Sequence, residues 1–398
     1  MLVVGGIYQE RCNHPDWDQI FGSAGRAACI ISGVLGQKVA LAGWYSKRGL
    51  PSLQASFAPY NVQLDVRLQS KHAIFDYFHP LSSPRTRFEA KPRWTSLDRF
   101  SSDVILMFGS LEGIPNISAK RLIIDPQGES ISDILDSKSF VAGQISIVAN
   151  ETESSLDNKL SLQENVKRLF ELDSRISVVV VKRGPLGAAV FQRRTARYTS
   201  VSSYRSNSVF KIGSGDAFSA AYSFAWGIGK KSPYDAADYA SRITACYVNN
   251  PYLNFAATST KQLSPIAARR KVAEIYLAGP FFTLADHLLL RETRYSLSEL
   301  GAKVFSPLHH VGTGLAKSIA KADLRGLRKS KCVLALLHTN DPGTLFEVGY
   351  ARSQRIPVVA LCERANECDI TMLAGTDCDV ETDFCTALYK AVWAALEK

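Results

Sequence analysis

Short apolar runs alternate with longer helical stretches along this chain, which leaves few folds open to it. The runs of a first series lie at residues 2–5, 39–42, 104–107, 122–124, 145–148 and 178–181. Runs of this length, separated by helices such as the one expected at 162–172, indicate a mostly parallel sheet covered by helices. Ligands of such sheets bind at the carboxyl ends of the strands, where Asp125 and Asn150 end two of the runs.

The alternation stops near residue 250 and then starts again. Asn249-Asn250-Pro251 breaks a helical stretch, and residues 256–271 have the small, polar and basic composition of a linker. New apolar runs follow at 273–278, 301–305, 333–337 and 358–361. They predict a doubly wound parallel α/β domain of the flavodoxin-like kind. Because 398 residues are too many for one ordinary core, we expect domains at 1–258 and 272–398, joined by a linker at 259–271.

The composition is that of a folded soluble protein, with 46% hydrophobic and 21% charged residues. No apolar run approaches the ~20 residues that span a bilayer. The first ten residues, MLVVGGIYQE, lack the basic segment of a signal peptide and lead directly into a strand. We therefore expect a cytoplasmic protein that does not contact a membrane.

The formal net charge of +10 raises the question of nucleic-acid binding. The basic residues are scattered in small groups, and no zinc-finger, RNA-recognition or helix-turn-helix pattern accompanies them. A general affinity for anions, including phosphorylated small molecules, explains the charge equally well. We therefore expect no nucleic-acid partner.

The eight cysteines show no pair with the spacing of a zinc knuckle, which is about two to four intervening residues. Four of them fall between Cys362 and Cys385, near acidic residues, so a metal or redox site there is one alternative. Thiols in a reducing compartment are the preferred interpretation. No metal ligands are assigned from the sequence.

Gly213-Ser214-Gly215-Asp216 opens an apolar helical segment. Small residues allow the backbone to turn tightly and to point its N–H groups at a phosphate, and the helix adds the positive end of its dipole. Asp216 then lies at the helix start, where it can take a proton from an attacking hydroxyl group. The pattern alone is weak evidence, because glycines at a helix N-terminus are common.

Two further motifs precede it in the order found in a known family. They are Asn150-x-x-Glu153 and the run from Val179 to Ala188 that contains Lys182-Arg183-Gly184. Together the three motifs make residues 1–258 resemble the ribokinase family of sugar and nucleoside kinases. The resemblance implies a ribokinase-like α/β sandwich, with ATP and Mg²⁺ as cofactors. It also implies site residues: Asp216 as the base, Gly213, Ser214 and Gly215 as the anion hole, and Asn150 and Glu153 positioning magnesium and phosphate.

Other segments depart from the family pattern. The family's Asp-Thr-x before the glycines is Phe210-Lys211-Ile212, and its Gly-Gly-x-x-x-Asn, whose Asn holds the sugar, is Phe21–Arg26. Its Gly-x-Asp-x-x-Gly is Trp44–Gly49. The family motifs for the nucleotide are therefore mostly present, and the family motifs for the sugar are replaced by other residues. A kinase with an unusual acceptor and a nucleotide-binding relic without turnover both remain open.

In the second half, Asp341 and Glu347 flank a turn that leads into a helix, and Asp323 lies one predicted strand upstream. Cleavage of a C–N glycosidic bond passes through a cation-like state of the sugar. A carboxylate beneath the sugar lowers that barrier, and a second acid takes up charge on the departing base. Gly343 would let the turn approach a ligand closely. Each residue alone also has an ordinary explanation, since Asp-Pro-Gly is a common turn and an early Glu offsets the helix dipole.

Four blocks of the second half occur together in family order and spacing: Ile275–Phe282, Phe305–Pro307, Asp323–Val333 and Asp341–Ala351. They make residues 272–398 resemble nucleoside 2-deoxyribosyltransferases and relatives that hydrolyse nucleotide N-glycosidic bonds. The resemblance implies that Glu347 is the nucleophile, that Asp323 orients the sugar and assists proton transfer, and that no cofactor is needed. The substrate-binding residues that it implies are Tyr276, Gly279, Asp341 and Gly343.

The leading hypothesis is an enzyme that cleaves or exchanges the N-glycosidic bond of a (deoxy)nucleoside or nucleotide, fused to an ATP-binding kinase-like domain. The choice between hydrolase and transferase stays open, as does phosphorylation of a nucleoside or sugar by the first domain. One alternative is a sensor–effector in which an inactive kinase-like domain gates a nucleotide- or dinucleotide-degrading glycosidase in a defence role. Another is a catalytically idle assembly protein. We also expect a homo-oligomer that forms through the second domains.

Overall fold

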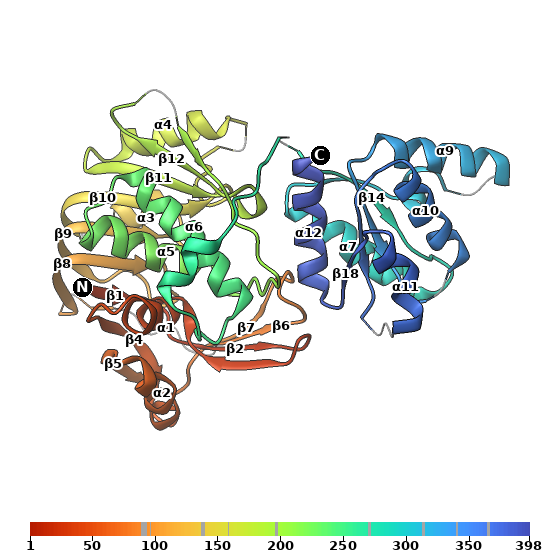
Figure 1. Cartoon of the computed structure of the whole chain (residues 1–398). Helices are drawn as coiled ribbons and strands as arrows, with labels where there is room; N and C mark the ends of the chain where they lie inside the picture. The colour runs from red at the N-terminus through yellow and green to blue at the C-terminus, as the bar shows by residue number, and fades with distance from the viewer. Residues whose placement is uncertain are drawn as a thin grey trace. The chain divides into compact units, whose positions relative to one another are not determined.

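The computed structural model describes residues 1–88, 94–95, 97–136, 140–157, 159–195, 198–269, 272–312, 315–339, 341–363 and 367–398, without the side chains of 367–369. The chain divides into two compact units (Figure 1). The first comprises residues 1–206 and 210–264, and the second comprises residues 207–209 and 265–398. Residues 270 and 271, at the end of the predicted linker, lie outside the described residues.

A nine-stranded sheet forms the centre of the first unit, with the order β13-β12-β11-β10-β9-β8-β1-β4-β5. All neighbours from β11 to β5 are parallel, and only β12 and β13 run antiparallel. The predicted, mostly parallel sheet is therefore confirmed. The strands are β1 Leu2–Val4, β4 Ala40–Ser46, β5 Gln63–Gln69, β8 Arg99–Phe108, β9 Asn116–Asp125, β10 Phe140–Asn150, β11 Ile176–Lys182, β12 Ala188–Gln192 and β13 Thr199–Val201.

Helices cover both faces of this sheet. On one face α1 (Gly22–Cys29), α5 (Ser214–Tyr222) and α6 (Pro233–Asn249) pack on each other and on the strands. On the other face α3 (Ile131–Asp136) and α4 (Leu162–Leu172) bury their apolar sides against the Val, Ile and Leu residues of β8 to β11. The remaining helical elements are η1 Ile30–Val34, α2 Leu50–Phe57, η2 Ala58–Tyr60, η3 Gly184–Leu186, η4 Ser223–Ile228 and η5 Ala257–Gln262.

A second, four-stranded sheet in the first unit has the order β3-β2-β6-β7. Its strands are β2 Gln9–Cys12, β3 Trp17–Ile20, β6 Ile74–Tyr77 and β7 Arg85–Arg87. The apolar-run pattern did not predict this sheet, because its strands are short and carry mixed polar and apolar side chains. Along β2 every second residue is buried, and one of these is the charged residue Glu10.

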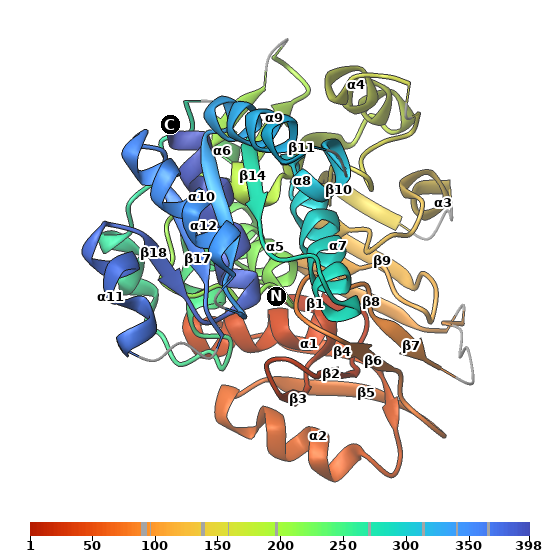
Figure 2. The same ribbon diagram turned by 90° about the vertical axis from the view of Figure 1, so that its right-hand side faces the viewer.

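The second unit is a five-stranded parallel sheet with the order β15-β14-β16-β17-β18, which is the predicted flavodoxin-like doubly wound arrangement. Its strands are β14 Glu274–Ala278, β15 Lys303–Phe305, β16 Cys332–Leu336, β17 Val358–Leu361 and β18 Asp379–Glu381. Its helices are α7 Leu284–Glu299, α8 Pro307–His310, α9 Ala316–Lys329, α10 Pro342–Ser353, α11 Glu367–Gly375 and α12 Phe384–Glu397. One face carries α7 and α12, and the other carries α9 and α10 (Figure 2).

The helices of the described ranges are all too short or too polar to span a bilayer.

Candidate active sites

In the second unit, a tyrosine and a glutamate from neighbouring elements meet beside the carboxyl edge of the sheet. Tyr276 lies in the inner strand β14 and is fully buried, and Glu347 lies in the second turn of α10. The Tyr276 hydroxyl donates a hydrogen bond of 2.5 Å to Glu347 Oε1. The pairing fixes one carboxylate oxygen of Glu347 and leaves Oε2 as the oxygen that can react.

Burial raises the pKa of Glu347 to about 7. The hydrogen bond from Tyr276 opposes this rise, and the nearby charges of Asp323 and Asp341 add to it. Burial, followed by the charge of Glu347, also raises the pKa of Tyr276, which therefore stays protonated as the donor. A carboxylate with a pKa this high is a stronger base and nucleophile than one exposed to water, and such shifts concentrate at functional sites.

The two other carboxylates near Glu347 differ in their surroundings. Asp323, on α9, has a buried Oδ1 atom without a hydrogen-bond partner among the described residues, and burial raises its pKa. Asp341 caps α10, because its Oδ2 accepts bonds of 2.7 Å from both the backbone N–H and the hydroxyl of Thr344. Buried polar atoms normally have hydrogen-bond partners, so the Asp323 oxygen is available for a ligand. Asp341, in contrast, already stabilises the start of α10 as its N-cap.

The two glycines differ as well. A Cβ atom on Gly279 would lie 3.2 Å from Leu336 Cβ. The absence of a side chain at Gly279 therefore lets the backbone pass close to the packed core where the chain leaves β14. A Cβ atom on Gly343 would lie 3.1 Å from Asp341 Oδ2, so this glycine keeps the cap open. The structure thus places Gly343 beside Asp341, while the packing around Gly279 is apolar.

Sequence reasoning did not assign two features of this edge. Phe305 stacks on Tyr276, with ring centroids 5.5 Å apart, and on His310 at 4.9 Å. His338, just after β16, forms a 2.7 Å contact from Nε2 to Asp286 Oδ1, and this contact lowers the pKa of Asp286 to about 2. Phe305 belongs to the block Phe305–Pro307 that carried the family resemblance, but no role was assigned to it; for His338 the only sequence signal was its position after β16, at a strand end where ligands bind.

In the first unit, α5 begins at the expected anion hole. Gly213 is its N-cap with a φ of 77°, a left-handed conformation that glycine adopts without strain, and Asp216 lies in the first turn. A Cβ atom on Gly215 would lie 3.4 Å from Lys182 Nζ, so a lysine stands beside the helix N-terminus. Backbone N–H groups, the positive end of the helix dipole and a lysine are the groups that favour an anion such as phosphate.

Asp216 is held by a buried arginine. The Arg26 guanidinium is fully buried and donates from Nη1 to Asp216 Oδ2 at 2.7 Å and to Glu10 Oε1 at 3.1 Å, with a second, short contact from Nη2 to Glu10 Oε2. Gln127 donates to the other oxygen of Asp216 at 3.3 Å. Burial raises the pKa of Asp216 to about 6; the Arg26 guanidinium opposes the rise, and the charges of Glu10 and Asp125 add to it.

Arg26 also lies close to the anion hole itself. A Cβ atom on Gly213 would be 2.2 Å from Arg26 Nε, and that nitrogen is buried without a hydrogen-bond partner in the described structure. Sequence comparison had placed Arg26 where the related kinases keep an asparagine for the sugar. The motif could not reveal the partner Glu10, because the two residues belong to different elements, α1 and β2.

The remaining predicted residues of the first unit lie at the ends of β9, β10 and β11. Lys182 Nζ contacts Asp125 Oδ2 at 2.7 Å. Glu153 accepts from the backbone N–H groups of Asn150 at 2.8 Å and Gly128 at 3.0 Å, and Asn150 Oδ1 accepts from Glu153 N at 2.8 Å. Burial raises the pKa of Glu153, and Lys182 opposes this.

The donor set fits a phosphate group better than a protein-held metal ion. Within the described ranges, no three His, Cys, Asp or Glu side chains gather as a metal cluster. A magnesium ion held mainly by phosphate oxygens and water needs only one or two protein carboxylates, and Glu153 is suitably placed at the strand ends for such a role.

Comparisons with known proteins agree with both folds. Residues 275–384 match the family model of nucleoside 2-deoxyribosyltransferase. Aminoimidazole riboside kinase from Salmonella enterica, complexed with aminoimidazole riboside and an ATP analog, has a similar structure, with a TM-score of 0.52 and 12% identity over 66% of this chain and 99% of that one. Ribokinase from Cryptococcus neoformans var. grubii serotype A in complex with ADP has a TM-score of 0.50 and 13% identity over 66% and 98%. No curated protein sequence matches the chain.

The chain is therefore a two-domain α/β protein assembled from two enzyme folds. Its first domain has the ribokinase-like fold, and residues 275–384 of its second domain match the family model of nucleoside 2-deoxyribosyltransferase.

Proposed function

We propose that the second unit cleaves the N-glycosidic bond of a nucleoside or nucleotide, with Glu347 as the nucleophile. The observation that carries this proposal is the 2.5 Å hydrogen bond from Tyr276 to Glu347, beside a buried oxygen of Asp323 that has no hydrogen-bond partner among the described residues. One carboxylate is oriented and held at a raised pKa, and a second is positioned to exchange a proton. These are the two groups that glycosidic cleavage through a covalent intermediate requires.

In the proposed reaction, Glu347 Oε2 forms a bond to the anomeric carbon as the C–N bond breaks. The bonding electrons leave with the base nitrogen, which takes up a proton from Asp323. In the second step water, or the nitrogen of another base, attacks the anomeric carbon, gives its proton to Asp323 and releases Glu347. Water as acceptor makes the protein a hydrolase, and a second base makes it a transferase.

The substrate would extend over the strand ends. Asp341, next to Gly343, would contact the base, and Gly279 would let the ligand approach the end of β14. Phe281 and Phe282 follow directly and stack on each other at 5.3 Å, with 38% and 75% of their surface exposed. Exposed aromatic rings suit a nucleobase, so a nucleoside or a dinucleotide is a better candidate than a simple monophosphate.

The first unit would bind ATP with its phosphates at Gly213–Gly215 and Lys182, and Mg²⁺ would arrive with the nucleotide near Asn150 and Glu153. Two functions are compatible with such binding. In one, Asp216 activates the hydroxyl of a sugar or nucleoside for phosphorylation. In the other, the unit binds nucleotide without turnover and gates the second unit, as in a defence protein that degrades nucleotides.

The contact between Arg26 and Asp216 favours the second function. A general base must reach the acceptor hydroxyl, and here one oxygen of Asp216 is bonded to a buried guanidinium and the other to Gln127. If this interpretation is right, the wild-type chain turns over no ATP with a broad panel of sugars and nucleosides. Steady magnesium-dependent ATP consumption with any acceptor would support the kinase instead.

The main test is mass spectrometry of the purified chain incubated with a nucleoside and dinucleotide panel, with and without ATP. Free base indicates hydrolysis, an exchanged nucleoside indicates transfer, and a phosphorylated product indicates kinase activity. The absence of all three products from every substrate would contradict the proposed function.

A further inference from the structure

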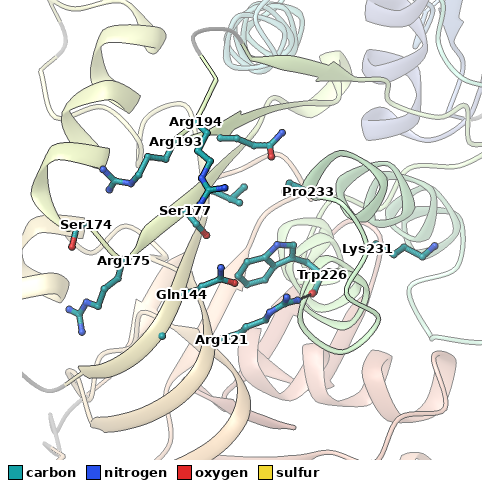
Figure 3. Close-up of a pocket in the computed structure, with 13 residues that line it drawn as sticks. Arg121, Gln144, Ser174, Arg175, Ser177, Arg193, Arg194, Trp226, Lys231 and Pro233 are labelled. Carbon is teal, nitrogen blue, oxygen red and sulfur yellow. Dashed lines mark hydrogen bonds between the residues drawn. The ribbon is translucent and has the colours of Figure 1, made fainter.

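A second basic site lies in the first unit, on the half of the sheet opposite the anion hole. Arg121 of β9 and Gln144 of β10 are paired in register, and β11 begins beside them with Ile176 opposite Ile145. Arg121 and Gln144 line a pocket of about 510 Å³, together with residues around the start of β11, of the turn after β12 and of η4 (Figure 3). Lys182 ends β11 five residues after Ser177, so by the rise of a strand the pocket and the anion hole are roughly 15–20 Å apart.

Five cationic side chains line this pocket: Arg121, Arg175, Arg193, Arg194 and Lys231. Arg175 forms an ion pair with Asp173 at 2.6 Å, and the charge of Arg193 also acts on this carboxylate, since both arginines lower the pKa of Asp173. Three positive charges, those of Arg121, Arg194 and Lys231, are left without a compensating carboxylate in the described structure. Like charges gathered in this way repel each other, which an anionic ligand would relieve.

Several of the cations are held in place by groups that do not neutralise them. Arg193 donates to the backbone oxygens of Ile176 at 2.7 Å and of Phe170 and Asp173 at 2.5 Å. Arg121 donates to the backbone oxygen of Trp226, and its guanidinium lies 5.0 Å from the centre of the Trp226 ring. Carbonyl groups and an aromatic face orient the guanidinium groups while leaving their charge available. Figure 3 shows Gln144, Arg121 and Trp226 close together in the pocket.

We propose that this pocket binds a small anion that carries two or more phosphate groups. Arginine forks match phosphate oxygens, and a single phosphate group is too small a charge to balance three cations together with the two arginines that share Asp173. A concave pocket of this volume is in the range of small-molecule sites, whereas a nucleic acid is bound by an extended basic surface. The site is separate from the anion hole, so one unit would hold two phosphate-bearing ligands.

The test is calorimetric titration of the full chain with inorganic triphosphate at moderate ionic strength. The variant is Arg194→Glu/Lys231→Glu, because both residues are exposed and their replacement leaves the packed parts of the unit unchanged. The matched control is Lys38→Glu, an exposed lysine of the same unit that does not line the pocket. A neutral variant, Arg194→Gln/Lys231→Gln, separates loss of attraction from repulsion.

We expect the wild type to bind triphosphate at two sites. The double Glu variant should weaken one site at least tenfold, the Gln variant should weaken it less, and Lys38→Glu should change it less than twofold. If ATP competes with inorganic triphosphate for this site, the site recognises the phosphate chain that the two ligands share. An unchanged isotherm in the double Glu variant would overturn the proposal. So would a short single-stranded oligonucleotide that displaces triphosphate from this site with much higher affinity, since the site would then be one for nucleic acid.

Discussion

Two opposing demands meet at Glu347. As the proposed nucleophile it must be ionised, yet burial raises its pKa to about 7 and so favours the neutral form at acidic pH. The hydrogen bond from Tyr276 favours the charged form and partly offsets the burial. The chemistry of this residue should therefore depend on pH and on one neighbouring hydroxyl group.

Replacement of Glu347 by Gln should lower the rate of base release by about a thousandfold or more, because loss of a covalent nucleophile removes the first step of the reaction. Glu299→Gln, at an exposed position of α7, makes the same chemical change away from the site and should leave the rate unchanged. The rates are measured by chromatography of the released base. A Glu347→Gln variant that keeps more than about a tenth of the wild-type rate would rule out the assignment.

The rate of base release should fall as the pH drops below about 7, because Glu347 is then protonated. Replacing Tyr276 by Phe removes a hydrogen bond that lowers the pKa of Glu347, so the midpoint of the pH profile should move to higher pH. The pH dependence of kcat/KM measures both. A midpoint that stays in place in the Phe variant would show that Tyr276 does not tune this carboxylate.

The same carboxylate should destabilise the fold at alkaline pH. Its pKa is about 7 in the folded chain against an ordinary value of 4.5, so its protonated form stabilises the fold at low pH and this stability is lost as the pH rises towards 7. Glu347→Gln should therefore raise the melting temperature more at pH 8 than at pH 5, relative to wild type. Equal shifts at the two pH values would contradict a raised pKa.

At the scale of elements, α10 both stabilises the fold and carries residues of the candidate site. Its N-cap Asp341 fixes the turn from which Glu347 projects, through two bonds to Thr344. Two residues of this helix, its N-cap Asp341 and its sixth residue Glu347, therefore lie at the carboxyl edge of the sheet. The capping role of Asp341 and its proposed contact with the base can be separated by substitution.

Asp341→Asn keeps an oxygen that can cap the helix, whereas Asp341→Ala removes it and should lower the free energy of unfolding by about 1 kcal/mol. If Asp341 also contacts the base, both variants should raise KM for the nucleoside. Denaturant melts and steady-state kinetics distinguish the two effects. Wild-type kinetics in the Asn variant would show that Asp341 caps the helix and does not contact the base.

The sequence predicted those elements whose apolar runs are continuous, such as β8 to β11 and β14, β16 and β17, because burial on both faces requires such runs. It missed the small sheet of β2, β3, β6 and β7 and the short polar strand β18, where pairing with neighbours decides the structure. At the site, the motifs named Asp216 and Glu347. They could not show Glu10 beside Arg26 or the Phe305 stack, because those contacts join residues that are distant in the chain.

At the scale of the whole molecule, exposed apolar side chains bear on assembly. Leu290 and Leu297 of α7 and Trp393 of α12 are buried within the structure. Leu288 stays 45% exposed, and Phe282, Leu284 and Phe346 of the second unit are 63% to 76% exposed. Large exposed apolar groups on one unit are typical of interaction surfaces.

We expect the chain to form at least a dimer through its second units. Multi-angle light scattering at micromolar concentration should give a mass of at least twice 43.7 kDa. Leu288→Ser/Phe346→Ser should shift the mass towards the monomer, while Leu172→Ser, an exposed leucine at the end of α4 in the first unit, should not. A fully active wild-type monomer would exclude the assembly.

The seven cysteine thiols among the described side chains are all buried, three in the first unit (Cys12, Cys29 and Cys246) and four in the second (Cys332, Cys362, Cys378 and Cys385). A buried thiol reacts with an alkylating reagent only when its surroundings open. The natural sequence thus contains a set of internal reporters for each unit. Pulsed alkylation followed by peptide mass spectrometry would give the opening rate of each unit separately, and nucleotide or nucleoside added before the pulse would reveal which unit it protects.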